Sequence, residues 1–354
     1  MALLHKGRGA SSNQQGRFES RSVEKVDDGW PLDEEPLPAL ETVVRPVQAR
    51  SILTRNSSPD IGFDQTINPY QGCEHGCIYC YARPSHGYLN LSAGLDFESR
   101  LFYKVNAAEV LEAELRRRSY KPEFTMLGAN TDCYQPIEKE HRITRAILEV
   151  LARFRHPVGI ITKGSLIERD LDLLADLARD RLVTVGITLT TLDPALKRTL
   201  EPRAPSAAAR LKVIRKLAEI GVPVRVMFSP VIPFVNDAEL ERVLEAGRDA
   251  GATSASYVLL RLPHEVKALF RDWLDTHLPL KAEHVMSLVQ QMRGGRDYDS
   301  AFGTRMRGEG AYAELIAQRY RLATRKLGLD RPRFEPDCTL FRVPAEGGQG
   351  AFAF

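Results

Sequence analysis

The sequence has 354 residues, 43% of them hydrophobic, which suits one α/β barrel with additional segments and provides for a sizeable core. Its formal net charge is only +3, which does not predict nucleic-acid binding, although it leaves room for a local basic groove. The N-terminus lacks the apolar stretch of a signal peptide, and no run approaches the roughly 18 apolar residues of a membrane span. We therefore expect a cytoplasmic protein without a membrane partner, in which clustered cysteines indicate metal binding or catalysis rather than disulfides.

The pattern along the chain divides it into four parts. Residues 1–60 are rich in Gly, Ser, Pro and charged residues, and we expect a poorly ordered segment or one that drapes over the folded core. From 61 to 265, nearly continuous apolar runs alternate with helical patterns. The expected strands are 66–70, 124–129, 157–163, 182–191, 222–230 and 254–263. The expected helices between them are 106–118, 138–154, 166–180, 207–221 and 237–251.

These alternating units predict an α/β fold, a partial (β/α)6 parallel barrel, because right-handed crossovers would wind six units into an open, curved parallel sheet. Residues 266–330 are expected to form a helical extension around a Gly/Arg-rich loop at 293–310, and 331–354 a C-terminal tail. In parallel barrels the chemistry gathers at the carboxyl ends of the strands. Polar residues that follow a predicted strand are therefore the candidates for a site.

Three cysteines follow the first predicted strand within the segment CEHGCIYC, residues 73–80. A structural zinc ion would need a fourth ligand, which the chain offers only as His75 or the distant Cys133 or Cys338. Unrelated buried cysteines would rarely cluster in this way. A four-iron cluster held by three cysteines would leave one iron open to bind a substrate or cofactor.

The motif C-x3-C-x2-C, with the aromatic Tyr79 just before its last cysteine, resembles the signature of radical S-adenosylmethionine (SAM) enzymes. Within that superfamily the chain is similar to the spore photoproduct lyase-like branch over about residues 60–265, and its flanks resemble a bacterial subgroup of unknown substrate. The segments that carry the resemblance are NPYQGCEHGCIYCYAR (68–83), ITKGS (161–165), TLTTLDPALKRTLEPRAPSAAARL (188–211) and VRVMFSPVIPFVND (224–237).

The resemblance implies that Cys73, Cys77 and Cys80 ligate a [4Fe-4S] cluster whose open iron binds SAM. One electron from a donor such as a flavodoxin or ferredoxin would cleave SAM to a 5′-deoxyadenosyl radical, which abstracts hydrogen from an unidentified substrate. A lyase-like reaction on a nucleic-acid lesion is the nearest family analogy, and fold does not fix substrate. The alternative is a non-catalytic protein that uses the three cysteines as a structural zinc site.

Polar residues after the second and third strands are candidates for holding SAM, as is Tyr79 by resemblance. Asn130, Thr131 or Asp132 would meet the amino group, and the alternative for Asp132 or Thr131 is a helix cap. Thr162 and Lys163 end the third strand. A buried lysine is costly without a partner, and the SAM carboxylate suits it; a salt bridge to Glu201 or Asp132 is the alternative.

Later strand ends supply four more candidates. Thr188 shares a strand face with Thr190, and we prefer Thr188 as the partner of the ribose. Glu201 and Arg203 either brace the SAM site or pair with each other. Arg261 ends the sixth strand and would face the pocket mouth, unless it is a surface arginine.

Evidence for a hydrogen donor and for a nucleic-acid substrate is weaker. Cys133 lies near the strand end where spore photoproduct lyases place a hydrogen-donating cysteine, although the spacing fits Asn130 better and a buried structural cysteine is the default. Residues 293–308 combine arginines with aromatic residues but net only +2. The arginines at 116–118 lie where they offset a helix dipole. Nucleic acid is therefore the less favoured partner.

Overall fold

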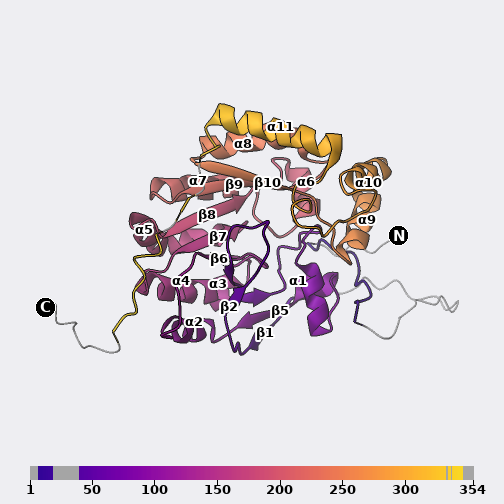
Figure 1. Ribbon diagram of the computed structural model, residues 1–354. Helices are drawn as coiled ribbons and strands as arrows, with labels where there is room; N and C mark the ends of the chain where they lie inside the picture. The colour runs from indigo at the N-terminus through magenta and orange to yellow at the C-terminus, as the bar shows by residue number, and fades with distance from the viewer. Residues whose placement is uncertain (1–6, 19–39, 332–333, 336, 346–354) are drawn as a thin grey trace.

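The computed structural model describes residues 7–18, 40–331, 334–335 and 337–345 (Figure 1). Its main sheet has seven strands in the order β10-β9-β8-β7-β6-β3-β2. All neighbouring strands are parallel except β2, which pairs antiparallel with β3. The strands are β2 (Leu53–Arg55), β3 (Gln65–Ile67), β6 (Thr125–Leu127), β7 (Val158–Thr162), β8 (Val183–Thr188), β9 (Val224–Val231) and β10 (Ser254–Leu259).

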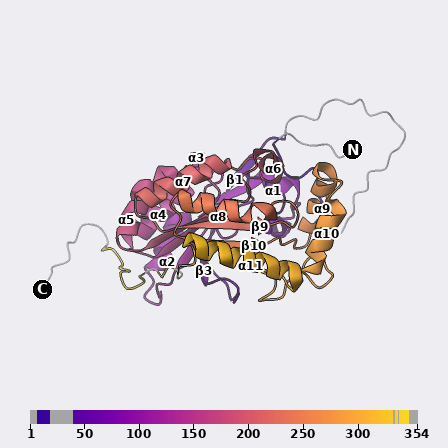
Figure 2. The same cartoon turned by 90° about the horizontal axis from the view of Figure 1, so that it is seen from above.

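Six consecutive parallel strands confirm the partial (β/α)6 barrel, and β2 and β10 are its two open edges. The crossover helices pack on one side of the sheet (Figures 1 and 2). They are α2 (Ala107–Leu115), α4 (Ile143–Arg153), α5 (Leu171–Arg179), α7 (Ala207–Glu219) and α8 (Leu240–Asp249), preceded in places by the short turns α3 (Glu138–His141), η2 (Ser165–Asp170) and η3 (Asp237–Glu239). The expected helix 138–154 is divided because Arg142 is left-handed, with φ of 53°.

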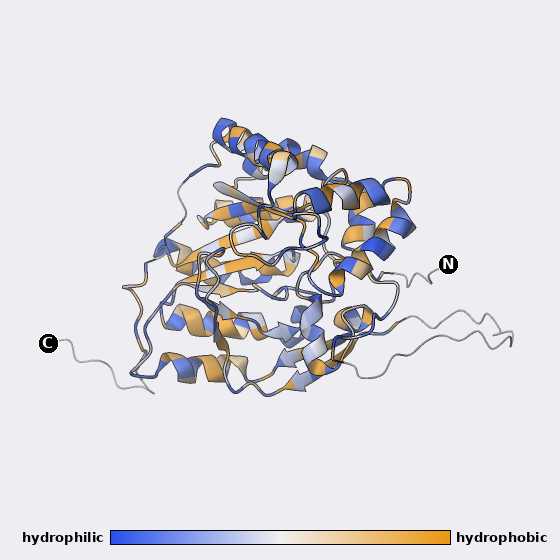
Figure 3. Ribbon diagram, turned by 45° about the vertical axis from the view of Figure 1, so that its right-hand side comes forward, coloured by the Kyte–Doolittle hydropathy of each residue, from blue (hydrophilic) through white to orange (hydrophobic). Residues whose placement is uncertain are grey.

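The core lies between the strands and these helices. Figure 3 shows the strands of the main sheet largely in the orange of hydrophobic residues. Ile160, Val185 and Val226 on the strands are at most 1% exposed, as are Leu148 and Leu217 on the helices. Burial of such apolar surface is the main driving force for folding. No helix in the described ranges is long and apolar enough to cross a lipid bilayer.

A second, smaller sheet includes a strand from residues 1–60, where no element was expected. It has the order β1-β5-β4, formed by β1 (Val43–Val47), β5 (Arg100–Lys104) and β4 (Tyr70–Gln71). β1 is half exposed and contains Pro46, so its sequence lacks the apolar run of a buried strand. Residues 1–6 and 19–39 of the expected N-terminal segment lie outside the described residues.

The extension after the barrel consists of α9 (Val266–His277), α10 (Ala282–Gln291) and α11 (Gly310–Leu327). In both Figures 1 and 2, α11 lies beside α8, whereas α9 and α10 lie near α6 (Pro194–Leu200). Trp273 of α9 donates to the Thr199 carbonyl at 3.1 Å, and its cluster of apolar residues includes Ile78 of the cysteine segment. The extension thus supports the end of the barrel that carries the cysteines.

Candidate functional site

The cysteine loop, residues 73–80, lies between β4 and the 3-10 helix η1 (Arg83–Leu89), at the carboxyl end of the parallel strands. Gly76 within it has φ of +67°, a left-handed conformation that favours glycine. A Cβ atom at Gly76 would also lie 2.8 Å from a carboxylate oxygen of Glu98. The loop therefore turns tightly only because this position carries no side chain.

The three cysteines of the loop are free thiols that influence one another. Cys73 and Cys77 are 7% and 8% exposed, and Cys80 is half-buried. Burial raises the pKa of Cys73 well above its usual range, and Asp132, Cys77 and Cys80 raise it further. Burial likewise raises the pKa of Cys77 to about 12. The thiols thus lie near one another in a setting that disfavours free thiolates and leaves their charge to be balanced by a bound cation.

The cysteines nevertheless do not converge on one point. Among the described residues, no three His, Cys, Asp or Glu side chains are grouped so that they could hold a single metal ion. Zinc requires its sulfur ligands about 2.3 Å from one centre. A four-iron cluster is larger, and each of its cysteines binds a different iron. The donor set, three thiols on one loop, fits the cluster better than it fits zinc.

A buried ion pair holds the backbone of the loop. Arg83 and Glu98, of η1 and α1 (Leu95–Ser99), are both fully buried and pair with each other. Arg83 also donates to the carbonyls of Cys77 at 2.9 Å and Gly76 at 3.2 Å. Because a buried charge is stable only when it is paired and hydrogen-bonded, this arrangement restrains the stretch between the first two cysteines.

Residues 7–14, which we call the N-terminal strap, lie across this ion pair. The backbone N–H groups of Gly9 and Ala10 each donate to the Glu98 carboxylate at 2.9 Å. Arg8 donates to the Glu98 carbonyl at 2.8 Å, and Leu95 donates to the Ser12 carbonyl at 3.3 Å. This part of the N-terminal segment therefore drapes over the core, at the cysteine loop.

Glu201 is the centre of a second buried network. Its carboxylate pairs with Arg210 and accepts hydrogen bonds from Tyr79 and, at 2.7 Å, from Thr190. Burial opposes ionisation of Glu201, but Arg210 and then Lys163 lower its pKa to about 2. The carboxylate is thus ionised, and it fixes the tyrosine that precedes the last cysteine.

Asp132 is engaged by the protein itself. One carboxylate oxygen accepts from the Thr162 hydroxyl at 2.5 Å and from the Tyr134 N–H at 2.9 Å. The other accepts from the Lys163 N–H at 2.7 Å and lies 3.3 Å from Nδ1 of His75. Asp132 therefore joins the cysteine loop to the end of β7, and the Thr162 hydroxyl is used in the same contact.

Lys163 forms no ion pair among the described residues, so neither expected salt bridge, to Glu201 or to Asp132, is present. Its Nζ lies 5.9 Å from the centre of the Tyr79 ring. Burial disfavours its charge, but Cys77 and Glu201 more than compensate and raise its pKa above the usual value. Lys163 is thus a half-buried cation beside the cysteine loop that lacks a carboxylate partner.

The other candidate residues, Arg203, Thr131, Thr188 and Asn130, contact the cysteine loop or neighbouring parts of the barrel. Arg203 pairs with Glu74 of the cysteine loop at 2.7 Å, so Glu201 and Arg203 do not pair with each other, contrary to one expectation. The Thr131 hydroxyl donates to the Tyr70 carbonyl at 2.8 Å. Thr188 is buried, and its carbonyl accepts from Arg210 at 3.0 Å. Asn130 is half-buried after β6, and its N–H donates to Asn68 at 2.9 Å.

Cys133 lies in the hydrophobic core and is 0% exposed. Burial raises the pKa of its thiol well above the usual range, and its carbonyl accepts from the Thr144 hydroxyl at 2.6 Å. This placement agrees with the default of a structural cysteine and gives no support to a hydrogen-donor role. Cys338 is half-buried in the C-terminal tail.

Tyr81 and Arg261 meet at the mouth of the barrel. The Tyr81 hydroxyl donates to the Ala129 carbonyl after β6, and the Tyr81 side chain is 47% exposed. The Arg261 guanidinium lies 5.2 Å from the centre of the Tyr81 ring. Arg261 therefore lies over Tyr81, a residue that was not among the expected site residues.

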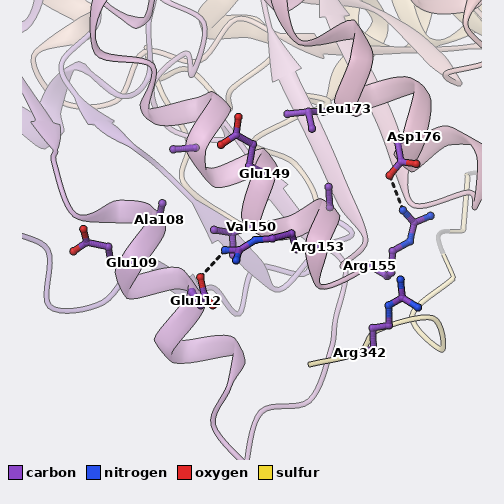
Figure 4. Close-up of a pocket in the computed structure, with 12 residues that line it drawn as sticks. Ala108, Glu109, Glu112, Glu149, Val150, Arg153, Arg155, Leu173, Asp176 and Arg342 are labelled. Carbon is purple, nitrogen blue, oxygen red and sulfur yellow. Dashed lines mark hydrogen bonds and ion pairs between the residues drawn. The ribbon is translucent and has the colours of Figure 1, made fainter. Parts of the chain in front are cut away.

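A groove elsewhere on the molecule carries no such chemistry. It has a volume of about 760 Å³ and lies between α2, α4 and α5, on the outer side of the helices (Figure 4). Four of its charged side chains pair with one another, Arg153 with Glu112 and Arg155 with Asp176 at 2.7 Å. We therefore do not assign the reaction to this groove.

Several supporting residues were missed from the sequence: Arg83, Glu98, Arg210, Gln135 and the strap. Gln135 donates to the Gly72 carbonyl at 3.1 Å and accepts from the Glu74 N–H at 2.9 Å. Arg83 and Arg210 lie within the quoted motif segments, so their position was a usable signal. Glu98 and the strap contact the loop only through the fold, and no local pattern marks them.

Comparison with known proteins agrees with this geometry. The family model described as the radical SAM superfamily matches residues 67–247. An uncharacterized protein of Mycobacterium tuberculosis is 35% identical over 314 residues, which cover 84% of this chain and 91% of that protein. An uncharacterized protein of Methanocaldococcus jannaschii is 32% identical over 178 residues, 50% of this chain and 64% of that protein.

Solved structures of spore photoproduct lyase share the fold. One, complexed with dinucleoside spore photoproduct, has a TM-score of 0.59 at 13% identity and covers 80% of this chain and 79% of its own. A variant with bound AdoMet and dinucleoside spore photoproduct has a TM-score of 0.58 at 14% identity, over 81% and 79% of the two chains. At such low identity these structures establish the architecture alone.

Proposed function

Because this chain belongs to the radical SAM superfamily, we propose that it is an enzyme that uses a [4Fe-4S] cluster and SAM to abstract hydrogen from a substrate not yet identified. The observation that carries the proposal is the cysteine loop. It presents three free thiols at the carboxyl end of a parallel barrel, where such folds place their chemistry.

Cys73, Cys77 and Cys80 would hold the cluster, since their number and spacing leave one iron without a protein ligand. When bound, the reduced cluster supplies the electron that cleaves SAM to methionine and a 5′-deoxyadenosyl radical, which takes a hydrogen atom from the substrate. The protein contributes a fixed loop: Arg83 holds its backbone, and Glu201 fixes Tyr79 beside its last cysteine.

Lys163 would bind the carboxylate of SAM. It is a half-buried cation beside Tyr79 of the loop, it forms no ion pair in the described part of the chain, and a buried charge needs such a partner. The Thr188 hydroxyl, one strand away, would bind the ribose, and Asn130 the amino group. Asp132 and Thr162 act on SAM only through their neighbours, because their own polar atoms are already engaged. Glu201 and Arg203 brace Tyr79 and the cysteine loop.

The wider assignments follow from the class of reaction. The cluster needs a one-electron donor such as a flavodoxin or ferredoxin, and a cytoplasmic location would keep its thiols reduced. The related structures that hold dinucleoside spore photoproduct make a nucleic-acid lesion the natural first substrate to try. Fold-level similarity does not fix the substrate. The zinc alternative is not favoured, because the three thiols and His75 form no group that could hold one ion.

Iron and sulfide content tests the cluster assignment. Anaerobic reconstitution of the full chain should give close to four irons and four sulfides per chain, and Cys77→Ala should lose them. Cys133→Ala, which removes a core thiol away from the loop, is the matched control and should retain the full content. A four-iron centre in Cys77→Ala, or bound zinc in place of iron, would refute the assignment.

A further inference from the structure

The acidic side chains at the carboxyl ends of the strands already have partners. Glu201 pairs with Arg210, Glu74 pairs with Arg203, and Asp132 accepts from Thr162, Tyr134 and the Lys163 backbone. Lys163 and Arg261 are two cations near the cysteine loop that form no ion pair in the described part of the chain. Neither cation is therefore neutralised by a direct ion pair, which leaves both able to bind an anionic ligand.

Arg261 is held only by neutral groups. Its Nη2 lies 3.3 Å from the Tyr298 hydroxyl, and its Nη1 lies 3.7 Å from the sulfur of Met306, a weak acceptor. Its guanidinium stacks on Tyr81, and its buried Nε has no hydrogen-bond acceptor. A buried donor without an acceptor is unfavourable, so this guanidinium has bonding capacity that the protein itself does not use.

A second guanidinium, that of Arg293, contacts the residue that precedes Arg261. Arg293 donates to the carbonyls of Leu260 at 2.9 Å and Thr304 at 2.8 Å, which are also neutral groups. Leu260 directly precedes Arg261, so the contact with its carbonyl brings the two guanidinium groups into the same region. Burial and then Arg261 lower the pKa of Arg293, which Asp299 partly opposes. A ligand that brings negative charge would relieve this repulsion.

Asp60, in the hairpin between β2 and β3, interacts with Arg261 through space but makes its hydrogen bonds elsewhere. It is bound by Arg305 and by the Gly303 N–H at 2.7 Å. These contacts fix the loop at 293–308 across the mouth. The Met306 side chain, which is flexible, is the group that an incoming acceptor would displace from Arg261.

SAM carries a single carboxylate, and in the function proposed above Lys163 takes it. We infer that Arg261 binds an oxyanion of the substrate, a phosphate or a carboxylate, beside Tyr81 at the mouth of the barrel. A guanidinium presents a planar, two-donor edge that matches such a group. Because Tyr81 directly follows Cys80, a substrate anchored here lies next to the cysteine loop. This inference rests on the proposed function for the identity of the site.

The test uses the full chain without its cluster, so that it does not depend on SAM cleavage. The melting temperature is measured as inorganic phosphate or acetate is added, with chloride holding the ionic strength constant. A saturable rise is expected, since a ligand that binds only the folded state stabilises it. The anion that gives the larger rise at equal concentration identifies the substrate as phosphate-bearing or carboxylate-bearing.

Three variants sharpen the result. Arg261→Gln should weaken the midpoint of the phosphate titration at least about tenfold, as expected for loss of one charge-assisted contact. Arg261→Lys, which keeps the charge without the planar fork, should lie between Arg261→Gln and the unmodified chain. Arg307→Gln changes an exposed arginine of the same loop and should bind phosphate as the unmodified chain does.

Two results would overturn the inference. One is an equal rise in the unmodified chain and in the folded Arg261→Gln and Arg261→Lys variants, which would make the effect independent of this guanidinium. The other is a tenfold loss of SAM affinity in reconstituted Arg261→Gln with phosphate binding unchanged, which would assign Arg261 to SAM. Either outcome leaves the cluster and SAM cleavage standing, because those are measured separately.

Discussion

The backbone of Gly9 passes directly over the carbonyl group of Gly76, in the stretch between the first two cysteines of the loop. A Cβ atom on Gly9 would lie 1.8 Å from that carbonyl oxygen, far inside any allowed contact. The same strap donates two N–H groups to Glu98, which pairs with the arginine that holds the loop. A segment near the start of the chain therefore closes over the centre proposed to bind the cluster.

Replacing Gly9 tests this closure. Gly9→Val should displace the strap and expose Cys73 and Cys77, whose side chains are now buried. Alkylation of these thiols in the cluster-free protein should accelerate on the order of tenfold, the factor that corresponds to about 1.4 kcal/mol of lost local stability. Ser11→Val adds the same side chain in the same strap and is the control. Equal alkylation rates in the two variants would show that the strap does not cover the thiols.

Removing Lys163 tests the proposed contact with SAM. Lys163→Ala should weaken SAM binding by about 2 kcal/mol, the usual range for a hydrogen bond to a charged group, and leave iron and sulfide content unchanged. Equilibrium binding of SAM to the reconstituted protein measures the first effect and chemical analysis the second. Lys212→Ala, an exposed lysine of α7, serves as the control. Unchanged SAM affinity would contradict the role assigned to the end of β7.

Replacing Glu201 should lower the free energy of unfolding. Glu201→Gln leaves the buried Arg210 without its counter-charge, and breaking a buried pair in this way costs roughly 3–5 kcal/mol. Urea unfolding of the cluster-free chain measures the loss. The double variant Glu201→Gln with Arg210→Met removes both charges and should recover part of it. If the double variant lost the sum of the two single effects, the pair would not be coupled.

The barrel could be predicted from the sequence because its strands are nearly continuous apolar runs, such as PVGIITK, which contains β7. Residues that directly follow such strands lie at the carboxyl end of the barrel. Lys163 and Arg261 could therefore be placed at that end from the sequence. The short strands β1 and β2 could not be found, since they are half-exposed and three to five residues long.

The contacts that fix the site were less predictable, because most of them join segments far apart in sequence. Arg203 and Glu201 are two positions apart and opposite in charge, yet each pairs with another residue, Arg203 with Glu74 and Glu201 with Arg210. Asp132 looked like a free acceptor in the sequence but is bound by the backbone of the next strand. Such choices depend on three-dimensional packing and not on local spacing.

The buried side chain of His156 should make the stability of the fold depend on pH. It is fully buried between the Tyr120 hydroxyl at 2.6 Å and the Pro157 carbonyl at 3.0 Å, and burial lowers its pKa to about 4. In the unfolded chain its pKa is about 6.5. Between these values the unfolded chain binds a proton that the folded chain does not, so stability falls as the pH decreases from 6.5 to 4.

The largest loss from this group is about 3 kcal/mol, because each unit of pKa difference corresponds to about 1.4 kcal/mol. Urea unfolding at a series of pH values should give a steeper acid decline for the unmodified chain than for His156→Gln. The glutamine keeps hydrogen-bonding capacity but does not titrate in this range. Parallel declines would mean that His156 does not carry the effect.

Electron paramagnetic resonance of the reduced, anaerobically reconstituted protein, recorded with and without SAM, shows directly whether the cysteine loop holds a SAM-binding cluster. We expect a four-iron signal that changes when SAM is added, together with formation of 5′-deoxyadenosine. A four-iron signal indifferent to SAM, or a protein that takes up zinc and no iron, would contradict this expectation and would make the cysteine loop a structural metal site.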